Sequence, residues 1–327
     1  MARLFGTDGV RGLANDQLTA ELALRLASAA AVVFAESSAT ESNRRPRAVV
    51  GRDPRASGEM LEAAVCAGLA ATGVDAICVG TVPTPAVAFL TADYHADFGV
   101  MISASHNPMP DNGIKFFSGG GHKLDDAVED RIEAAMDGEF IRPIGAAVGR
   151  IVAAPDAGDR YRRHLAQAVD TRLDGLTVVV DCAHGAASEL APQAYADAGA
   201  TVIAIHAEPD GLNINADCGS THMDKLQAAV LEHGADLGLA HDGDADRCFV
   251  VDEKGQPVSP SAICALVASR YLDKFPGATI IHNLITSKTV PELIAEKGGT
   301  AVRTRVGHSF IKAQMAEHKA AFGGEHS

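Results

Sequence analysis

The strongest constraint on the fold is a repeated order of segments along the chain. Helix-like stretches tend to end near a glycine and are followed by short runs rich in β-branched residues. Alternating helices and strands of this kind predict successive α/β domains with mixed sheets. We expect helices at 57–71, 187–198, 223–232, 261–272 and 290–297, one more opening at Thr84-Pro85, and strands at 74–82, 97–102, 176–180, 201–205, 278–281 and 301–305.

Two turn-rich seams divide the 327 residues. Residues 138–158 are rich in glycine, proline and alanine, and residues 252–260 form a cluster of turn-forming residues. They predict three domains, at 1–150, 151–254 and 255–327. The last of these stops shortly after a glycine turn, so we expect an α/β fold that is incomplete at its C-terminus.

The charge of the chain limits its partners. It has 28 lysines and arginines against 42 aspartates and glutamates, a formal charge of −14, which argues against non-specific binding to nucleic acid or to an anionic membrane. The longest apolar stretch, 26–35, is shorter than the roughly 20 residues of a membrane span. The N-terminus has no apolar signal core. We therefore expect a cytoplasmic protein that binds neither nucleic acid nor membrane.

The six cysteines are scattered, with no Cys-x-x-Cys pair. This spacing favours reduced cytosolic thiols over a zinc site or a disulfide framework.

The first segment that could carry chemistry is Ser105-His106-Asn107-Pro108, directly after an apolar run. A serine at the end of a buried strand is held by a rigid base at the sheet edge where α/β proteins bind ligands. The alternative is a polar turn in which Ser105 and His106 cap backbone groups. The segment lacks the Gly-x-Ser-x-Gly pattern, which argues against a serine hydrolase.

The second segment places Asp242, Asp244 and Asp246 alternately in one loop between two apolar runs. Unpaired carboxylates at this spacing repel one another, and a hard divalent cation such as Mg²⁺ or Ca²⁺ removes that cost. An EF-hand is disfavoured because Arg247 stands where that loop needs glycine, although Glu253 falls at its twelfth position. A solvated acidic turn is the other alternative.

Two weaker signals remain. Residues 6–12 form a glycine-rich loop that contains Arg11 and could meet an anion, or could be a turn with a surface ion pair. The loop matches neither the Walker A pattern nor the Gly-x-Gly-x-x-Gly pattern of nucleotide-binding proteins. The polar clusters at 304–309 and 324–327 each follow a strand-like run, and ordinary loop polarity is the alternative for both.

Taken together, these segments resemble the α-D-phosphohexomutase superfamily. The resemblance rests on the Ser105 loop with Asp111-Asn112-Gly113-Ile114-Lys115, the Asp-Gly-Asp-Ala-Asp-Arg loop, and the Gly-Glu-x-Ser ending. Residues 1–251 are most similar to the phosphoglucosamine mutase branch. Residues 306–312 are more similar to the phosphomannomutase/phosphoglucomutase branch. The fourth domain of the family, with its phosphate-gripping loop, has no counterpart in this sequence.

The resemblance implies a reaction. Ser105 would carry a phosphoryl group, donate it to a hexose monophosphate and recover another from the bound 1,6-bisphosphate, so that phosphate moves between O6 and O1. The implied cofactors are Mg²⁺, held by Ser105, Asp242, Asp244 and Asp246, and a hexosamine 1,6-bisphosphate that acts as activator and intermediate.

It also implies roles for further residues. Arg247 would clamp the transferring phosphoryl group, and Lys115 would do acid–base work because a lysine near other cations has a lowered pKa. His106 would orient the seryl phosphate, with Arg11 close by. The residues implied to contact the sugar are Gly307, His308, Glu325 and Ser327.

The expected partner is a small-molecule sugar phosphate, and a homodimer is left open. The first hypothesis is a mutase acting on glucosamine phosphates, with mannose and glucose phosphates as rival substrates. The second hypothesis is a non-catalytic, Mg²⁺-dependent module that binds sugar phosphates.

Overall fold

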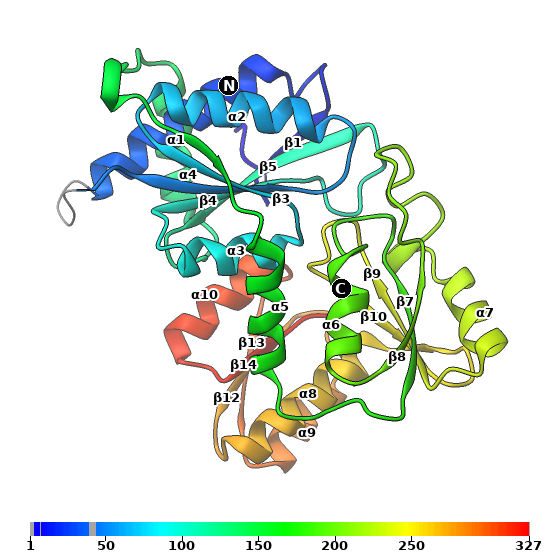
Figure 1. Cartoon of the computed structure of the whole chain (residues 1–327). Coiled ribbons are helices and arrows are strands. Elements are labelled where there is room, and N and C mark those ends of the chain that lie inside the picture. The colour runs from blue at the N-terminus through cyan, green and yellow to red at the C-terminus, as the bar shows by residue number, and fades with distance from the viewer. Residues whose placement is uncertain (1–2, 7, 39–43, 327) are drawn as a thin grey trace. The chain divides into compact units, whose positions relative to one another are not determined.

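The computed structural model describes residues 3–6, 8–38 and 44–326. It divides into two compact units, Met1–Cys248 and Phe249–Ser327 (Figure 1).

The first unit begins with a six-stranded mixed sheet in the order β1-β5-β4-β2-β3-β6. β2 pairs in parallel with β3 and β4, and β3 with β6, whereas β5 is antiparallel to both β1 and β4. The strands are β1 (Val10–Leu13), β2 (Arg47–Arg52), β3 (Asp75–Thr81), β4 (Phe98–Ile102), β5 (Asp111–Ser118) and β6 (Ile151–Ala153).

Helices cover both faces of this sheet (Figure 1). α1 (Ala20–Ser38), α2 (Gly58–Ala71) and α4 (Asp126–Met136) pack against one buried apolar cluster. α3 (Thr84–Asp93) and α5 (Ala157–Ala168) belong to the cluster on the other face. β4 therefore lies in the middle of the layers with all five residues buried. A short 3₁₀ turn, η1 (Gly145–Ala147), precedes β6.

A second sheet of the same unit contains β7 (Thr177–Asp181), β8 (Thr201–Ile205) and β9 (Leu237–His241). β7 is central and pairs in parallel with both neighbours. α6 (Leu190–Asp197) and α7 (Asp224–His233) connect these strands. The carboxyl ends of the three strands therefore meet at one edge, where α/β proteins bind ligands.

The second unit is built on a small parallel sheet in the order β13-β12-β14. It starts with the antiparallel pair of β10 and β11. Its elements are β10 (Cys248–Val251), β11 (Pro257–Val258), α8 (Pro260–Lys274), β12 (Thr279–Asn283), α9 (Thr289–Glu296), β13 (Thr300–Thr304), α10 (His308–His318) and β14 (Phe322–Gly324).

The predicted fold class, α/β with mixed sheets, is confirmed. The expected helices and strands are present, with ends shifted by a few residues. The largest shift is in the helix expected at 187–198, which begins at Leu190 because residues 183–189 form turns. The seam at 138–158 contains β6, which pairs with β3 across the predicted boundary at 150.

Within the described ranges, no helix combines the length and the apolar character that a membrane crossing requires. The cytoplasmic location stays a prediction.

Candidate active site

Ser105 lies in the loop that follows the buried strand β4. Its side chain is almost fully buried, and its backbone has a φ of 53°, in the left-handed region that few non-glycine residues adopt. The backbone N–H of Ser105 donates to Ser103 Oγ over 2.9 Å. Such backbone strain persists only where the surroundings hold the residue in place.

Arg55, directly after β2, holds this loop. The guanidinium is fully buried and pairs with Asp53, with 2.9 Å between Nε and Oδ2. Its two Nη atoms donate to four carbonyl oxygens of the loop, those of Ser105, Asn107, Pro108 and Asp111. A buried cation whose donors are all used fixes the backbone that surrounds it.

The second loop of the site follows β9 and carries the three alternating aspartates. Ser105 Oγ donates to Asp242 Oδ2 over 2.6 Å. A Cβ at Gly243 would lie 2.6 Å from the carbonyl oxygen of Ser105, so glycine is needed for this approach. The structure thus brings together two segments that the sequence analysis assigned to one site.

The three carboxylates fit a cation. Asp242, Asp244 and Asp246 each offer an oxygen, and these oxygens lie within 4.8 Å of one another. Asp244 is fully buried, and its Oδ1 has no hydrogen-bond partner among the described residues. An unpaired buried carboxylate oxygen is costly. A divalent ion with oxygen preference would satisfy it.

The same crowding shifts the pKa values of the three carboxyl groups. Burial and the charge of Asp244 raise the pKa of Asp242. Partial burial and the charges of Asp244 and Asp242 raise the pKa of Asp246 to about 7. Burial would also raise the pKa of Asp244, but the ammonium of Lys115 outweighs it and lowers that pKa to about 2. Asp246 is therefore about half protonated at neutral pH.

Arg247 links the serine to the aspartates. Its Nη2 donates to Ser105 Oγ over 3.0 Å and to Asp242 Oδ2 over 2.9 Å. The same nitrogen donates to Nδ1 of His106. Burial and the nearby guanidinium of Arg247 lower the pKa of His106, so the imidazole is neutral and accepts this bond.

Lys115 lies on β5 between two carboxylates. Its Nζ is 2.8 Å from Asp244 Oδ2 and 2.8 Å from Asp8 Oδ2. Burial alone would lower the pKa of Lys115, but the charges of Asp244, Asp8 and Asp246 outweigh burial and raise it. The expectation of a lysine with a lowered pKa among cations is wrong for this arrangement, because carboxylates surround it.

Arg11 lies beside the Ser105 loop, as expected. It is on β1 opposite Gly113, and its Nη1 donates to the carbonyl of Ala104 over 3.4 Å. Its Nη2 forms an ion pair of 2.8 Å with Asp8. Asp8 therefore joins Arg11 and Lys115.

The remaining predicted residues lie in the second unit. Glu325 Oε1 accepts from the backbone N–H of Gly307 over 2.7 Å and from Asn283 Nδ2 over 3.2 Å. The structure thus brings Gly307 and Glu325 together. The side chain of His308 and all of Ser327 lie outside the described residues.

Sequence reasoning missed several residues that shape the site. Thr84, at the start of α3, donates its hydroxyl to Asp244 over 2.6 Å. Asn215 Nδ2 donates to the carbonyls of Ser105 and Asn107. Of these residues, Asp53 and Arg55 could have been noticed in the sequence, because they are a pair of opposite charges shortly after the apolar strand β2.

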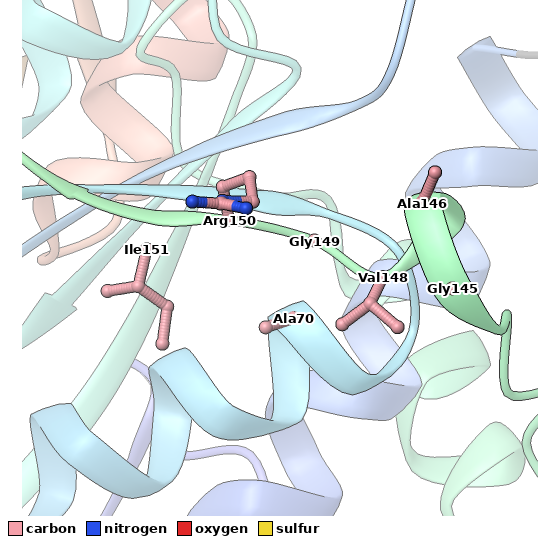
Figure 2. A pocket seen from close by; sticks show the side chains of 7 residues that line it. All are labelled: Ala70, Gly145, Ala146, Val148, Gly149, Arg150 and Ile151. Carbon is pink, nitrogen blue, oxygen red and sulfur yellow. The ribbon is translucent and has the colours of Figure 1, made fainter.

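A separate pocket of about 350 Å³ lies between the C-terminal end of α2 and the segment around η1 (Figure 2). Its lining is mostly apolar or glycine, with Arg150 as the charged residue, and it includes none of the predicted site residues. Figure 2 shows Val148 and Ile151 on the same side of their segment as Ala70 of α2. This pocket is therefore not part of the candidate site formed by the Ser105 and Asp242–Asp246 loops.

Comparison with known proteins gives matches along the whole chain. Models of phosphoglucomutase/phosphomannomutase α/β/α domains I, II and III match residues 2–142, 159–255 and 259–327. A crystal structure of a protein of this family from Burkholderia thailandensis is similar with a TM-score of 0.86 and 28% identity, over 99% of this chain and 70% of that one.

Curated relatives are nearer in sequence. The phosphoglucosamine mutases of Rhodococcus opacus (strain B4) and Mycolicibacterium smegmatis (strain ATCC 700084 / mc(2)155) are each 59% identical to the chain. Each match covers all of this chain and 74% of the relative. Both matches therefore include the residues after Val251, where residues 306–312 were expected to be closer to the phosphomannomutase/phosphoglucomutase branch.

The chain belongs to the phosphoglucomutase/phosphomannomutase family, the α-D-phosphohexomutases, and is an isomerase that transfers a phosphoryl group. Within that family it belongs with the phosphoglucosamine mutases.

The first prediction concerns the buried guanidinium. Arg55→Ala leaves Asp53 buried without its partner and frees four loop carbonyls, so it should lower the free energy of unfolding by about 3–5 kcal/mol. Urea denaturation measures this. Arg172→Ala removes an ion pair with Asp174 that is exposed on both sides, and it should leave the free energy of unfolding nearly unchanged. Equal losses in the two variants would contradict the role of Arg55.

The second prediction concerns the proton on Asp246. Because its pKa is about 7, a metal ion must displace this proton at lower pH. Apparent Mg²⁺ affinity should rise about tenfold per pH unit up to about pH 7 and then level off. Calorimetric titration across this range measures it. Asp246→Asn should bind more weakly and give a flatter profile, and a flat profile in the unaltered protein would count against the assignment.

Proposed function

We propose that the chain interconverts glucosamine 6-phosphate and glucosamine 1-phosphate, with Ser105 as the phosphoryl carrier and a bound 1,6-bisphosphate as the intermediate. The observation that carries this proposal is the 2.6 Å hydrogen bond from Ser105 Oγ to Asp242, inside a group of three carboxylates that can hold a cation. The 59% identity to phosphoglucosamine mutases supports the amino sugar as substrate.

The geometry orients the serine hydroxyl for phosphoryl transfer. Ser105 Oγ donates a hydrogen bond to Asp242 Oδ2 and accepts one from Arg247 Nη2, so that two side chains fix its position. Arg247 can then bind phosphoryl oxygens with its planar fork. His106, with Nδ1 engaged by Arg247, keeps Nε2 as the nitrogen that carries hydrogen and can orient the seryl phosphate.

The aspartates and the seryl oxygen would hold Mg²⁺, which when bound neutralises charge on the phosphoryl group. Thr84 and Lys115 both hold Oδ2 of Asp244 in place. Oδ1 of the same carboxylate has no hydrogen-bond partner among the described residues and would be available to hold the ion.

Lys115 is proposed for the proton transfer to and from the sugar oxygen. The surrounding carboxylates keep its ammonium protonated, so it starts as the donor. Asp8 also contacts Arg11, which places a further positive charge beside the serine loop.

Sugar recognition is proposed for the loops of the second unit, on Gly307, His308, Glu325 and Ser327. The carboxylate of Glu325 is held by the N–H of Gly307 and by Asn283. A rigid carboxylate acceptor of this kind suits a sugar hydroxyl or an ammonium group.

We propose that the chain has three domains, divided near residues 150 and 254. The loops with Gly307 and Glu325 then belong to the third domain.

The test of the serine uses mass and turnover together. The purified chain should carry one phosphoryl group on Ser105 and convert glucosamine 6-phosphate, and Ser105→Ala should lose both properties. Ser118→Ala, whose hydroxyl bonds the carbonyl of His122 in the same unit, is the matched control and should retain both. Binding without turnover would indicate the non-catalytic module, and turnover confined to mannose or glucose phosphate would overturn the amino-sugar assignment.

A further prediction separates Lys115 from the metal. Lys115→Met removes the proton donor, so turnover should fall by about 10²–10⁴-fold. Mg²⁺ affinity should not fall, because the variant loses a positive charge next to Asp244. Steady-state kinetics and calorimetry measure the two quantities. Turnover within about threefold of the unaltered protein would remove Lys115 from proton transfer.

A further inference from the structure

A second group of metal-ligand side chains lies in the first unit, apart from the three aspartates. Asp181 is the last residue of β7, and His206 directly follows β8, the parallel neighbour of β7. Cys218 precedes the 3₁₀ turn η2 (Gly219–Thr221). Three loops that are separate in the sequence therefore meet at one end of the sheet.

The donor atoms of these residues are close enough to share one ion. One ligand atom each from Asp181, His206 and Cys218 lies within 4.8 Å of the others. Asp181 Oδ2 is 3.0 Å from His206 Nδ1. Asp181 and Cys218 are almost fully buried, whereas the side chain of His206 is 17% exposed.

One ring nitrogen, Nδ1, of each imidazole at this place has no hydrogen bond within the described ranges. His206 Nδ1 is buried and makes no hydrogen bond of good geometry within the described ranges, despite its distance to Asp181. His184 Nδ1 is likewise buried and unpartnered there, and its ring lies edge-on to that of His206 at 5.3 Å. Buried polar nitrogens without partners are costly unless another group binds them.

The surroundings already hold the carboxylate in one orientation. Asp181 Oδ1 accepts from the N–H of Ala183 over 2.9 Å, and Oδ2 accepts from the N–H of Gly219 over 3.0 Å. Backbone donors of this kind are the usual outer support of metal-binding carboxylates. Burial and the charge of Asp181 raise the pKa of the Cys218 thiol to about 12. The thiol is therefore neutral until an ion displaces its proton.

We propose that Asp181, His206 and Cys218 bind a zinc-class divalent ion at a site of their own. A set of one oxygen, one nitrogen and one sulfur suits Zn²⁺ and does not suit Mg²⁺, which prefers oxygen alone. The fourth position is left to His184 or to a water.

The ion would have a structural consequence for the serine loop. The segment between His206 and Cys218 carries Asn215, which donates to the carbonyls of Ser105 and Asn107. An ion that ties both ends of this segment to β7 would order it. Ordering the segment supports the Ser105 backbone without contact with substrate.

The test begins with protein stripped by a chelator and then kept in excess Mg²⁺, which occupies hard-oxygen sites. One equivalent of Zn²⁺ should remain bound after desalting, and it should raise the Tm by about 5 °C. Co²⁺ in its place should give a thiolate-to-metal charge-transfer absorption. Retention of no ion, or a cobalt spectrum without a thiolate band, overturns the proposal.

Variants locate the ion. Cys218→Ser and His206→Asn should lower Zn²⁺ affinity at least about tenfold. Asparagine tolerates the left-handed backbone of His206, whose φ is 48°. Cys182→Ser alters a buried cysteine next to Asp181 outside the group and should bind Zn²⁺ normally.

Equal affinity in Cys218→Ser and Cys182→Ser overturns the proposal. So does loss of Zn²⁺ in Asp246→Asn, since that result would place the ion on the three aspartates. Should both cluster variants fail to fold, the cobalt spectrum of the unaltered chain decides.

Discussion

A buried positive charge determines where the reactive serine lies. Arg55 has no access to solvent, so its donors must all be met within the protein, and four of its acceptors are carbonyls of the loop that contains Ser105. The loop cannot relax away from this arrangement without leaving the guanidinium unpaired. This rigidity accounts for the left-handed backbone at Ser105. The hydroxyl is thereby presented to Asp242 from a fixed base.

The negative charges of the three aspartates are partly balanced by the cationic side chains that lie beside them. Arg247 lies 2.9 Å from Asp242 and Lys115 lies 2.8 Å from Asp244, whereas Arg247 lies 3.7 Å from Asp246, whose pKa is raised. The protein has thus provided two cations for three carboxylates. A divalent ion completes the balance, and the phosphoryl group brings the negative charge that it can neutralise.

The sequence predicted the two reactive segments because each is compact and chemically unusual: a serine after a buried strand, and three alternating aspartates between apolar runs. Their meeting could be expected only from the family resemblance, since 137 residues separate Ser105 from Asp242. Thr84 and Asn215 belong to no site pattern in the sequence, and only the folded chain shows that they contact the loops of the site. The charged pair of Asp53 and Arg55 is visible in the sequence, but its contacts with the serine loop are not. The Asp181, His206 and Cys218 group escaped for the same reason, because its ligands come from three loops and form no local spacing pattern.

Three chain segments converge on the single carbonyl oxygen of Ser105: Arg55 and Asn215 donate to it, and Gly243 packs against it. Polar loops at the end of a strand usually open readily to solvent. This loop cannot open without releasing all three segments at once. Its backbone amides should therefore exchange with solvent deuterium as slowly as those of the central strands, so that the most reactive part of the molecule is also among its least mobile.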